Sequence, residues 1–254
     1  MTPEVNRASS ATGFADTGGA TDDETFPIVG IGASAGGLEA LEQMLTAVPP
    51  NSGMAFVVIQ HLDPSRPGML PELLQRTTPM LVRQADNRMK IRPDCIYVIP
   101  PNKDLSILHG SLYLLDPVAH RGLHLPIDSF LTSLAEDRRE QAIAVILSGM
   151  GSDGTAGLAA IRRHGGLALV QTPETAKFDA MPRSAIDAGL ADIVAPADQL
   201  PGLILGWKTH HPSLAGVPIE RDTRASSSAF EKVCILLREH TGHDFSLYKK
   251  STVY

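Results

Sequence analysis

Short apolar segments that alternate with helical ones constrain this sequence more than any other feature. Apolar runs that end in glycine or polar residues are typical of strands buried on both faces of a sheet. Six such runs lie at 26–32, 54–60, 95–101, 142–148, 167–171 and 191–195. Helical patterns of apolar residues lie between or after them, at 37–48, 67–74, 126–139, 154–166, 182–189 and 197–207. This alternation predicts a doubly wound, mostly parallel α/β sheet with helices on both faces.

One segment departs from the alternation and adds an antiparallel annex. Residues 104–115 contain two alternating runs separated by His109-Gly110, which is the pattern of a β-hairpin. With this hairpin included, residues 26–208 form a block of plausible size for a single α/β domain. We therefore expect one catalytic or binding domain over 26–208.

The two ends of the chain have a different composition. Residues 1–25 are rich in Ala, Thr, Gly, Ser and Asp and predict a disordered leader. Residues 209–228 are rich in Pro, Ser and Thr and predict a linker. Residues 229–254 begin with a helical apolar stripe, in which Cys234 is one member. We expect this last segment to be dispensable for the chemistry of the main domain.

Charge and composition exclude several classes of protein. The 22 basic and 28 acidic residues give a formal net charge of −6, which argues against non-specific binding to nucleic acid or to an anionic membrane. No apolar run approaches the roughly 20 residues of a membrane span, and the start lacks the pattern of a secretory signal. The two cysteines, Cys95 and Cys234, cannot make a disulfide framework or a cysteine-based zinc site. We expect a cytoplasmic protein with no membrane insertion.

Polar residues follow three of the predicted strands. Ser34 lies in a glycine-rich turn after the first strand, His61 follows the second, and Asp153 lies among glycines after the run at 142–148. The carboxyl ends of parallel strands meet at one edge of the sheet, where ligands bind. The sequence therefore brings a serine, a histidine and an aspartate to one edge.

These three residue types suit nucleophilic acyl chemistry. A serine hydroxyl becomes a nucleophile when an imidazole takes its proton, and a carboxylate orients that imidazole. Backbone N–H groups of a glycine-rich loop can stabilise the oxyanion. Ser34 and Asp153 both lie in such loops.

Other interpretations of the same residues remain open at this point. Gly30, Gly32 and Ala35 satisfy a dinucleotide-binding fingerprint, although the acidic residue expected after the second strand is replaced by Gln60 and His61. His61 alone can be a core histidine, and Asp153 alone can cap the next helix. A nucleotide-binding oxidoreductase is therefore the main competing class.

Several longer motifs resemble one family closely. The segments 29–37, 57–64, 125–137, 144–161 and 174–186 resemble, in the same order, the catalytic domain of CheB-type protein-glutamate methylesterases of bacterial chemotaxis. The resemblance implies a Ser-His-Asp triad made of Ser34, His61 and Asp153, with the backbone N–H of Met150 as oxyanion donor. Ala35 stands where many members of the family have Thr.

The resemblance also implies a substrate and a domain context. It implies hydrolysis of glutamate γ-methyl esters on the cytoplasmic domain of methyl-accepting chemoreceptors, and deamidation of receptor glutamine, with no cofactor and no metal. The tail at 229–254 resembles the start of the helical domain of CheR-type methyltransferases, which implies a fused methyltransferase domain. A catalytically silent regulatory module is the third class that we consider.

Overall fold

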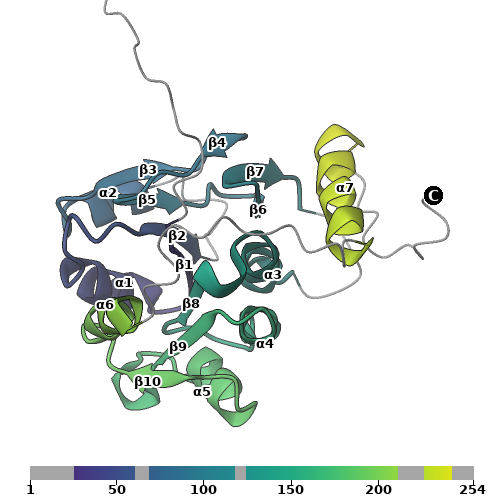
Figure 1. Cartoon of the computed structure of the whole chain (residues 1–254). Coiled ribbons are helices and arrows are strands. Elements are labelled where there is room, and N and C mark those ends of the chain that lie inside the picture. Colours follow the sequence, from purple (N-terminus) through teal and green to yellow (C-terminus); the bar gives the residue numbers. More distant parts are fainter. Residues whose placement is uncertain (1–25, 61–68, 118–123, 211–225, 242–254) are drawn as a thin grey trace, which may run out of the picture.

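The fold is built on one parallel sheet (Figure 1). The computed structural model describes residues 26–60, 69–117, 124–210 and 226–241. Seven strands, all parallel, lie in the order β10-β9-β8-β1-β2-β5-β3. Their bounds are β1 Ile28–Ala33, β2 Ala55–Gln60, β3 Leu81–Gln84, β5 Cys95–Val98, β8 Ala142–Ile146, β9 Leu167–Gln171 and β10 Ile193–Ala195. The predicted 1–25 leader lies outside the described residues.

Helices cover both faces of this sheet, as Figure 1 shows. One face packs against α1 (Gly37–Thr46), α2 (Leu70–Gln75) and α6 (Leu200–His210). The other packs against α3 (Pro126–Arg138), α4 (Thr155–Arg163) and α5 (Ala180–Asp187). Single turns of 3₁₀ helix occupy Arg139–Gln141 and Pro173–Thr175. The predicted doubly wound α/β fold is confirmed.

A small antiparallel sheet lies beside the main one. It has the order β4-β7-β6, with β4 at Met89–Lys90, β6 at Asp104–Leu108 and β7 at Ser111–Leu115. The turn between β6 and β7 has positive φ at both His109 (50°) and Gly110 (68°), which is the geometry of a two-residue type I′ hairpin. The predicted hairpin annex is confirmed, whereas β4 was not predicted.

The glycines of β1 allow α3 to pack closely on the sheet. A Cβ on Gly30 would lie 2.7 Å from Leu131 Cδ2, and one on Gly32 would lie 2.5 Å from Ile127 Cγ2. A side chain at either position would therefore displace the helix. These two glycines of the dinucleotide fingerprint thus have a structural role that involves no nucleotide.

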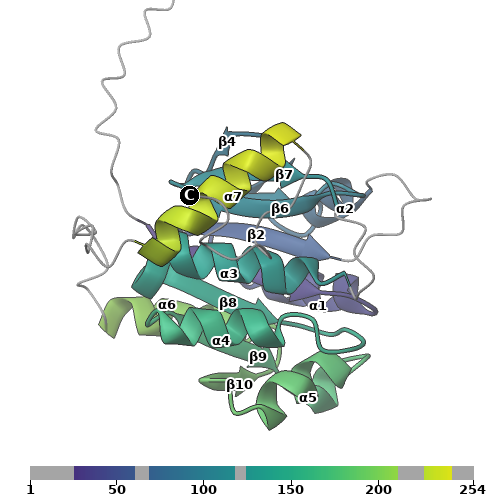
Figure 2. The same cartoon turned by 90° about the vertical axis from the view of Figure 1, so that its right-hand side faces the viewer.

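The last described helix, α7 (Ser226–Thr241), lies against the small sheet. Figures 1 and 2 both place it beside β7, on the side of the molecule that carries α3. Cys234 on this helix is buried, whereas Cys95 on β5 is half-buried. Within the described residues, no helix combines the length and apolar character that crossing a bilayer requires.

Candidate active site

The three strands that precede the predicted site residues are neighbours. β1 lies between β8 and β2 and is paired in parallel with both. From β1 the chain winds outward to β2 on one side, and β8 returns on the other side, so the winding reverses beside β1. In open α/β sheets, ligands bind at the carboxyl edge of such a reversal point. Ser34 lies just beyond the end of β1, at this position.

Backbone hydrogen bonds fix the turn that carries Ser34. Its N–H donates to the carbonyl of Ser148 at 3.0 Å, which continues the β1–β8 ladder beyond the formal strand ends. Its carbonyl accepts from the N–H of Gly37, the first residue of α1, at 2.9 Å. Gly36 caps that helix at a φ of 68°, a conformation that favours glycine. The Ser34 backbone is therefore held by a strand on one side and a helix start on the other.

The glycine-rich loop after β8 lies directly beside Ser34. A Cβ on Gly149 would stand 3.0 Å from Ser34 Cβ and 2.1 Å from Met181 Sδ. The loop is fixed to α5 and to the segment before it, since Gly149 donates to the carbonyl of Phe178 at 2.9 Å and accepts from the N–H of Met181, in the first turn of α5, at 3.0 Å. Met150 follows and is 61% exposed. The predicted oxyanion donor and the predicted nucleophile are therefore on adjacent segments.

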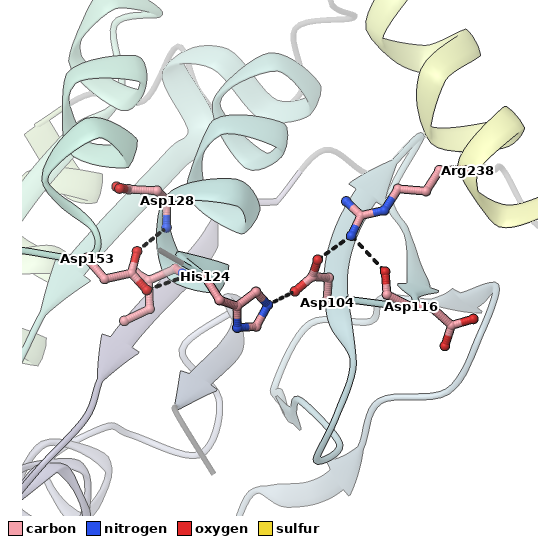
Figure 3. A network of polar contacts seen from close by, with 7 residues as sticks. Asp104, Asp116, His124, Asp128, Asp153 and Arg238 are labelled. Atoms are coloured by element: carbon pink, nitrogen blue, oxygen red, sulfur yellow. Dashed lines mark hydrogen bonds and ion pairs between the residues drawn. The ribbon is translucent and has the colours of Figure 1, made fainter. Parts of the chain in front are cut away.

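Asp153 is buried, and its carboxylate caps a helix. Its two oxygens accept from the backbone N–H groups of Ile127, at 3.1 Å, and Asp128, at 2.9 Å (Figure 3). Both donors lie in the first turn of α3, where the helix dipole favours a negative charge. The alternative interpretation expected Asp153 to cap the following helix, but that cap is Gly154. Asp153 instead joins the glycine-rich loop to α3.

Asp128 makes the reciprocal contact between the same two helices. Its carboxylate accepts from the N–H of Gly157, in the first turn of α4, at 2.7 Å. Burial raises the pKa of Asp128; the Gly157 N–H opposes this shift, and the charge of Asp153 adds to it. Asp128 of α3 thus caps α4, and Asp153, just before α4, caps α3. These reciprocal contacts fix the position of Asp153.

His61 lies outside the described residues. The described part of β2 ends at Gln60, which is paired with Ala33, the residue before Ser34. The chain therefore leaves β2 at the same edge and level as it leaves β1. The assignment of His61 as the base stays a prediction.

Sequence reasoning missed Ser148, which connects the parts of the site. Its side chain is almost fully buried, and its hydroxyl donates to the carbonyl of Ala35 at 2.9 Å and accepts from the N–H of Phe178 at 3.0 Å. Its own N–H donates to Gln171 Oε1 at 2.9 Å. The only signal in the sequence was a polar residue at the end of a buried apolar run, immediately before the glycine-rich loop.

Two other residues considered from the sequence have ordinary partners. Arg183 forms an ion pair with Asp179 at 2.6 Å on the surface of α5. His124, expected in a solvated loop with His120, contacts Asp104 at 2.5 Å, and His120 lies outside the described residues. No cluster of three or more metal-binding side chains occurs in the part of the chain that the structure describes.

The comparisons with known proteins agree on one family. Residues 29–204 match the family model described as CheB methylesterase. A Moorella thermoacetica protein named protein-glutamate methylesterase/protein-glutamine glutaminase is 33% identical over 187 residues, covering 72% of this chain and 44% of that protein. A Leptospira interrogans protein is 32% identical over 181 residues, covering 71% of this chain and 94% of that protein. The chain thus spans less than half of the first relative.

A solved structure agrees with these matches. The catalytic domain of the Thermotoga maritima CheB methylesterase superposes with a TM-score of 0.66 at 32% identity. The match covers 72% of this chain and 98% of that domain. The chain described here belongs to the CheB methylesterase family.

Proposed function

We propose that this chain is a protein-glutamate methylesterase that uses Ser34, His61 and Asp153. The observation that carries the proposal is the placement of the nucleophile turn against the glycine-rich loop. Ser34 and Gly149 are in near contact, and the same loop leads to a buried carboxylate fixed by two helix N–H groups. The family match and the names of the relatives supply the substrate class.

The proposed reaction proceeds through an acyl-enzyme. His61 takes the proton of the Ser34 hydroxyl as the serine oxygen attacks the ester carbonyl. The resulting oxyanion accepts a hydrogen bond from the Met150 N–H, while protonated His61 gives its proton to the departing methoxide. Methanol leaves, and water then attacks the acyl-enzyme with His61 again acting as base. The products are glutamate and methanol.

Asp153 has the properties that the acid of such a triad needs. Its two helix N–H contacts hold both oxygens in place, and a carboxylate can accept more than two hydrogen bonds. It can therefore accept an imidazole N–H while staying fixed. A carboxylate in that role holds the imidazole tautomer and stabilises its protonated form.

The same acyl-enzyme can form from an amide. The relatives' name includes protein-glutamine glutaminase activity, and loss of ammonia instead of methanol would produce the same intermediate. We therefore propose deamidation of receptor glutamine as a second reaction of this site. The proposed partner is the cytoplasmic domain of a methyl-accepting chemoreceptor, the proposed location is the cytoplasm, and no step requires a cofactor.

The test is methanol release from a methylated receptor domain. We expect the wild-type chain to release methanol and Ser34→Ala to release none while unfolding at the same temperature, because the Ser34 side chain is half-buried and leaves no core cavity. Ser111→Ala, at the start of β7 in the small sheet and away from the carboxyl edge of the main sheet, is the control and should match the wild type. A serine-directed phosphonate should label Ser34. Label on another residue would refute the assignment, and an inactive wild type would favour a silent regulatory module.

A further inference from the structure

The helix α7 lies beyond the part of the chain that matches the family. The family match ends at residue 204, and α7 covers Ser226–Thr241. Nothing in the family match therefore accounts for its packing on the small sheet. Among its described side chains Cys234 is buried, and Arg238 and Glu239 make specific polar contacts, which distinguishes it from a helix that merely covers an apolar surface.

The first contact involves a buried carboxylate. Asp104, the first residue of β6, is 4% exposed. One of its oxygens pairs with Arg238 of α7, and the other contacts Nε2 of His124 at 2.5 Å (Figure 3). The same Arg238 nitrogen donates to the carbonyl of Asp116 at 2.8 Å. Because a buried carboxylate is costly without partners, Arg238 provides part of what Asp104 requires.

The second contact lies on the neighbouring residue of the helix. The Glu239 side chain is 8% exposed and accepts from Arg88 Nε at 2.9 Å and from Asn87 Nδ2 at 3.0 Å. Asn87 also accepts from the N–H of Leu114 on β7 at 3.1 Å. Two adjacent side chains of α7 are therefore paired with residues on two sides of the small sheet.

These contacts lead towards the active site. His124 lies two residues before Pro126, where α3 begins, and Ile127 and Asp128 of that first turn donate to Asp153. Figure 3 shows Arg238, Asp104 and His124 in line with the Asp128–Asp153 contact. A short stretch of backbone thus separates the ion pair of α7 from the amides that hold the proposed catalytic acid.

We infer that Asn87 and Arg88, just before β4, and Asp104, on β6, form a docking surface at the two edges of the small sheet for α7 of the same chain. We also infer that Arg238 acts through Asp104 and His124 as a positioning residue for Asp153. The coupling to Asp153 rests on the proposed function. The docking itself does not. Docking of the segment that follows the esterase then sets the rate of the esterase.

Docking is measured first, with Cys234 as the natural probe. In the full chain with Cys95→Ala, the buried Cys234 thiol should react slowly with a thiol reagent. Arg88→Glu should increase that rate about tenfold or more, and Arg88→Glu/Glu239→Arg should restore it by reversing the ion pair. Unchanged labelling in Arg88→Glu would refute the docking. A dimer that forms with rising concentration in sedimentation, and that is lost in Arg88→Glu, would show that α7 of a second copy binds the small sheet. That result would also refute docking within one chain.

Coupling is measured on Arg88→Glu, on the charge-reversed pair and on a further variant, Arg238→Ala. Arg238→Ala and Arg88→Glu should lower kcat at least about fivefold, the lower end of coupling between sites, with KM unchanged. Hydrogen exchange of the Ile127 and Asp128 amides should become faster, and the charge-reversed pair should restore both readings. The control Arg163→Ala, exposed on α4, should change neither. If Cys234 is labelled faster in Arg88→Glu while kcat and the exchange of the Ile127 and Asp128 amides stay unchanged, the coupling is refuted. If the wild type proves inactive, the exchange of the Ile127 and Asp128 amides still decides whether docking of α7 is coupled to the start of α3.

Discussion

At the scale of single residues, two carboxylates of opposite roles lie on adjoining helix starts. Asp153 accepts from the first turn of α3, and Asp128 accepts from the first turn of α4. Because both are carboxylates that cap a helix, Asp128 is a matched control for the proposed acid, Asp153. The strand-end pattern of the sequence found Asp153. It could not reveal which helix Asp153 caps, because that depends on the packing of α3 against α4.

Asp153→Asn should reduce turnover by about 10⁴, the loss seen when the acid of such a triad becomes an amide. The amide has one acceptor oxygen for two helix N–H groups, so the free energy of unfolding should also fall by about 1–3 kcal/mol. Methanol release and chemical denaturation measure the two effects separately. A variant that lost stability but kept its rate would show that Asp153 only caps α3.

Asp128→Asn should leave turnover within a few-fold of the wild type. The folded-state pKa of Asp128 is raised, so its charged form is less favourable in the folded protein than in the unfolded chain. The free energy of unfolding therefore falls as the pH rises from the ordinary carboxyl pKa through the raised one. A neutral amide at this position removes this pH-dependent loss of stability. At pH 7 the free energy of unfolding of Asp128→Asn, measured by denaturation, should therefore equal or exceed that of the wild type. If this substitution abolished turnover, the assignment of the acid would be wrong.

Ser148→Ala tests the residue that the sequence did not single out. The change removes the acceptor of the Phe178 N–H and the donor to Ala35, so we expect a loss of about 1–3 kcal/mol in the free energy of unfolding. Because both contacts position segments around Ser34, kcat should fall as well. Ser106→Ala, also a buried serine but on β6, is the control for both measurements. Equal kcat in the two variants would remove Ser148 from the site.

At the scale of elements, the apolar pattern predicted the buried strands of the main sheet and missed one exposed edge strand, β3. The buried strands β1, β2 and β8 are apolar runs in the sequence, and all three were predicted. β3 was missed because it is an edge strand with three of four residues exposed, so its sequence carries no apolar period. The packing of α3 on Gly30 and Gly32 was also hidden, because a glycine pattern fits a phosphate site and a close helix contact equally well.

The docking of α7 should weaken in acid. Burial alone would raise the pKa of Glu239, but the hydrogen bonds from Arg88 and Asn87 lower it below its usual 4.5. Because the pKa is lowered in the docked state, the contribution of Glu239 to the free energy of docking is complete above the ordinary carboxyl pKa. It is lost as the pH falls through the lowered pKa of the docked state.

Amide exchange of residues 233–241, corrected for the intrinsic rate, should therefore rise between about pH 5 and pH 3. In Glu239→Gln this part of the pH dependence should be absent, and exchange at pH 7 should be faster than in wild type. Parallel pH profiles for the two proteins would show that another group controls docking in acid.

At the scale of the whole molecule, the position of α7 bears on where the catalytic unit ends. The domain limits predicted from the sequence, 26–208, 209–228 and 229–254, place most of α7 in a methyltransferase segment that the esterase does not need. Its first three residues, 226–228, fall in the predicted linker, of which 211–225 lie outside the described residues. The resemblance of the tail to CheR still supports a fused methyltransferase as a proposal. The two ion pairs of α7 with the small sheet nevertheless lead to a different expectation for its removal.

A chain that ends after His210 should fold and still hydrolyse the ester, but more slowly. It retains residues 29–204, the range of the family match, and both hydrophobic clusters that cover the main sheet. It loses Arg238, so Asp104 keeps His124 as a partner and exposes its second oxygen to solvent. We expect kcat to fall as far as in Arg238→Ala of the full chain, with KM unchanged and a loss of about 1–3 kcal/mol in the free energy of unfolding. Steady-state kinetics of both proteins, side by side, make the comparison. A shortened chain with the full wild-type kcat would show that α7 only rests on the esterase, whereas one that cannot fold would place α7 within its core.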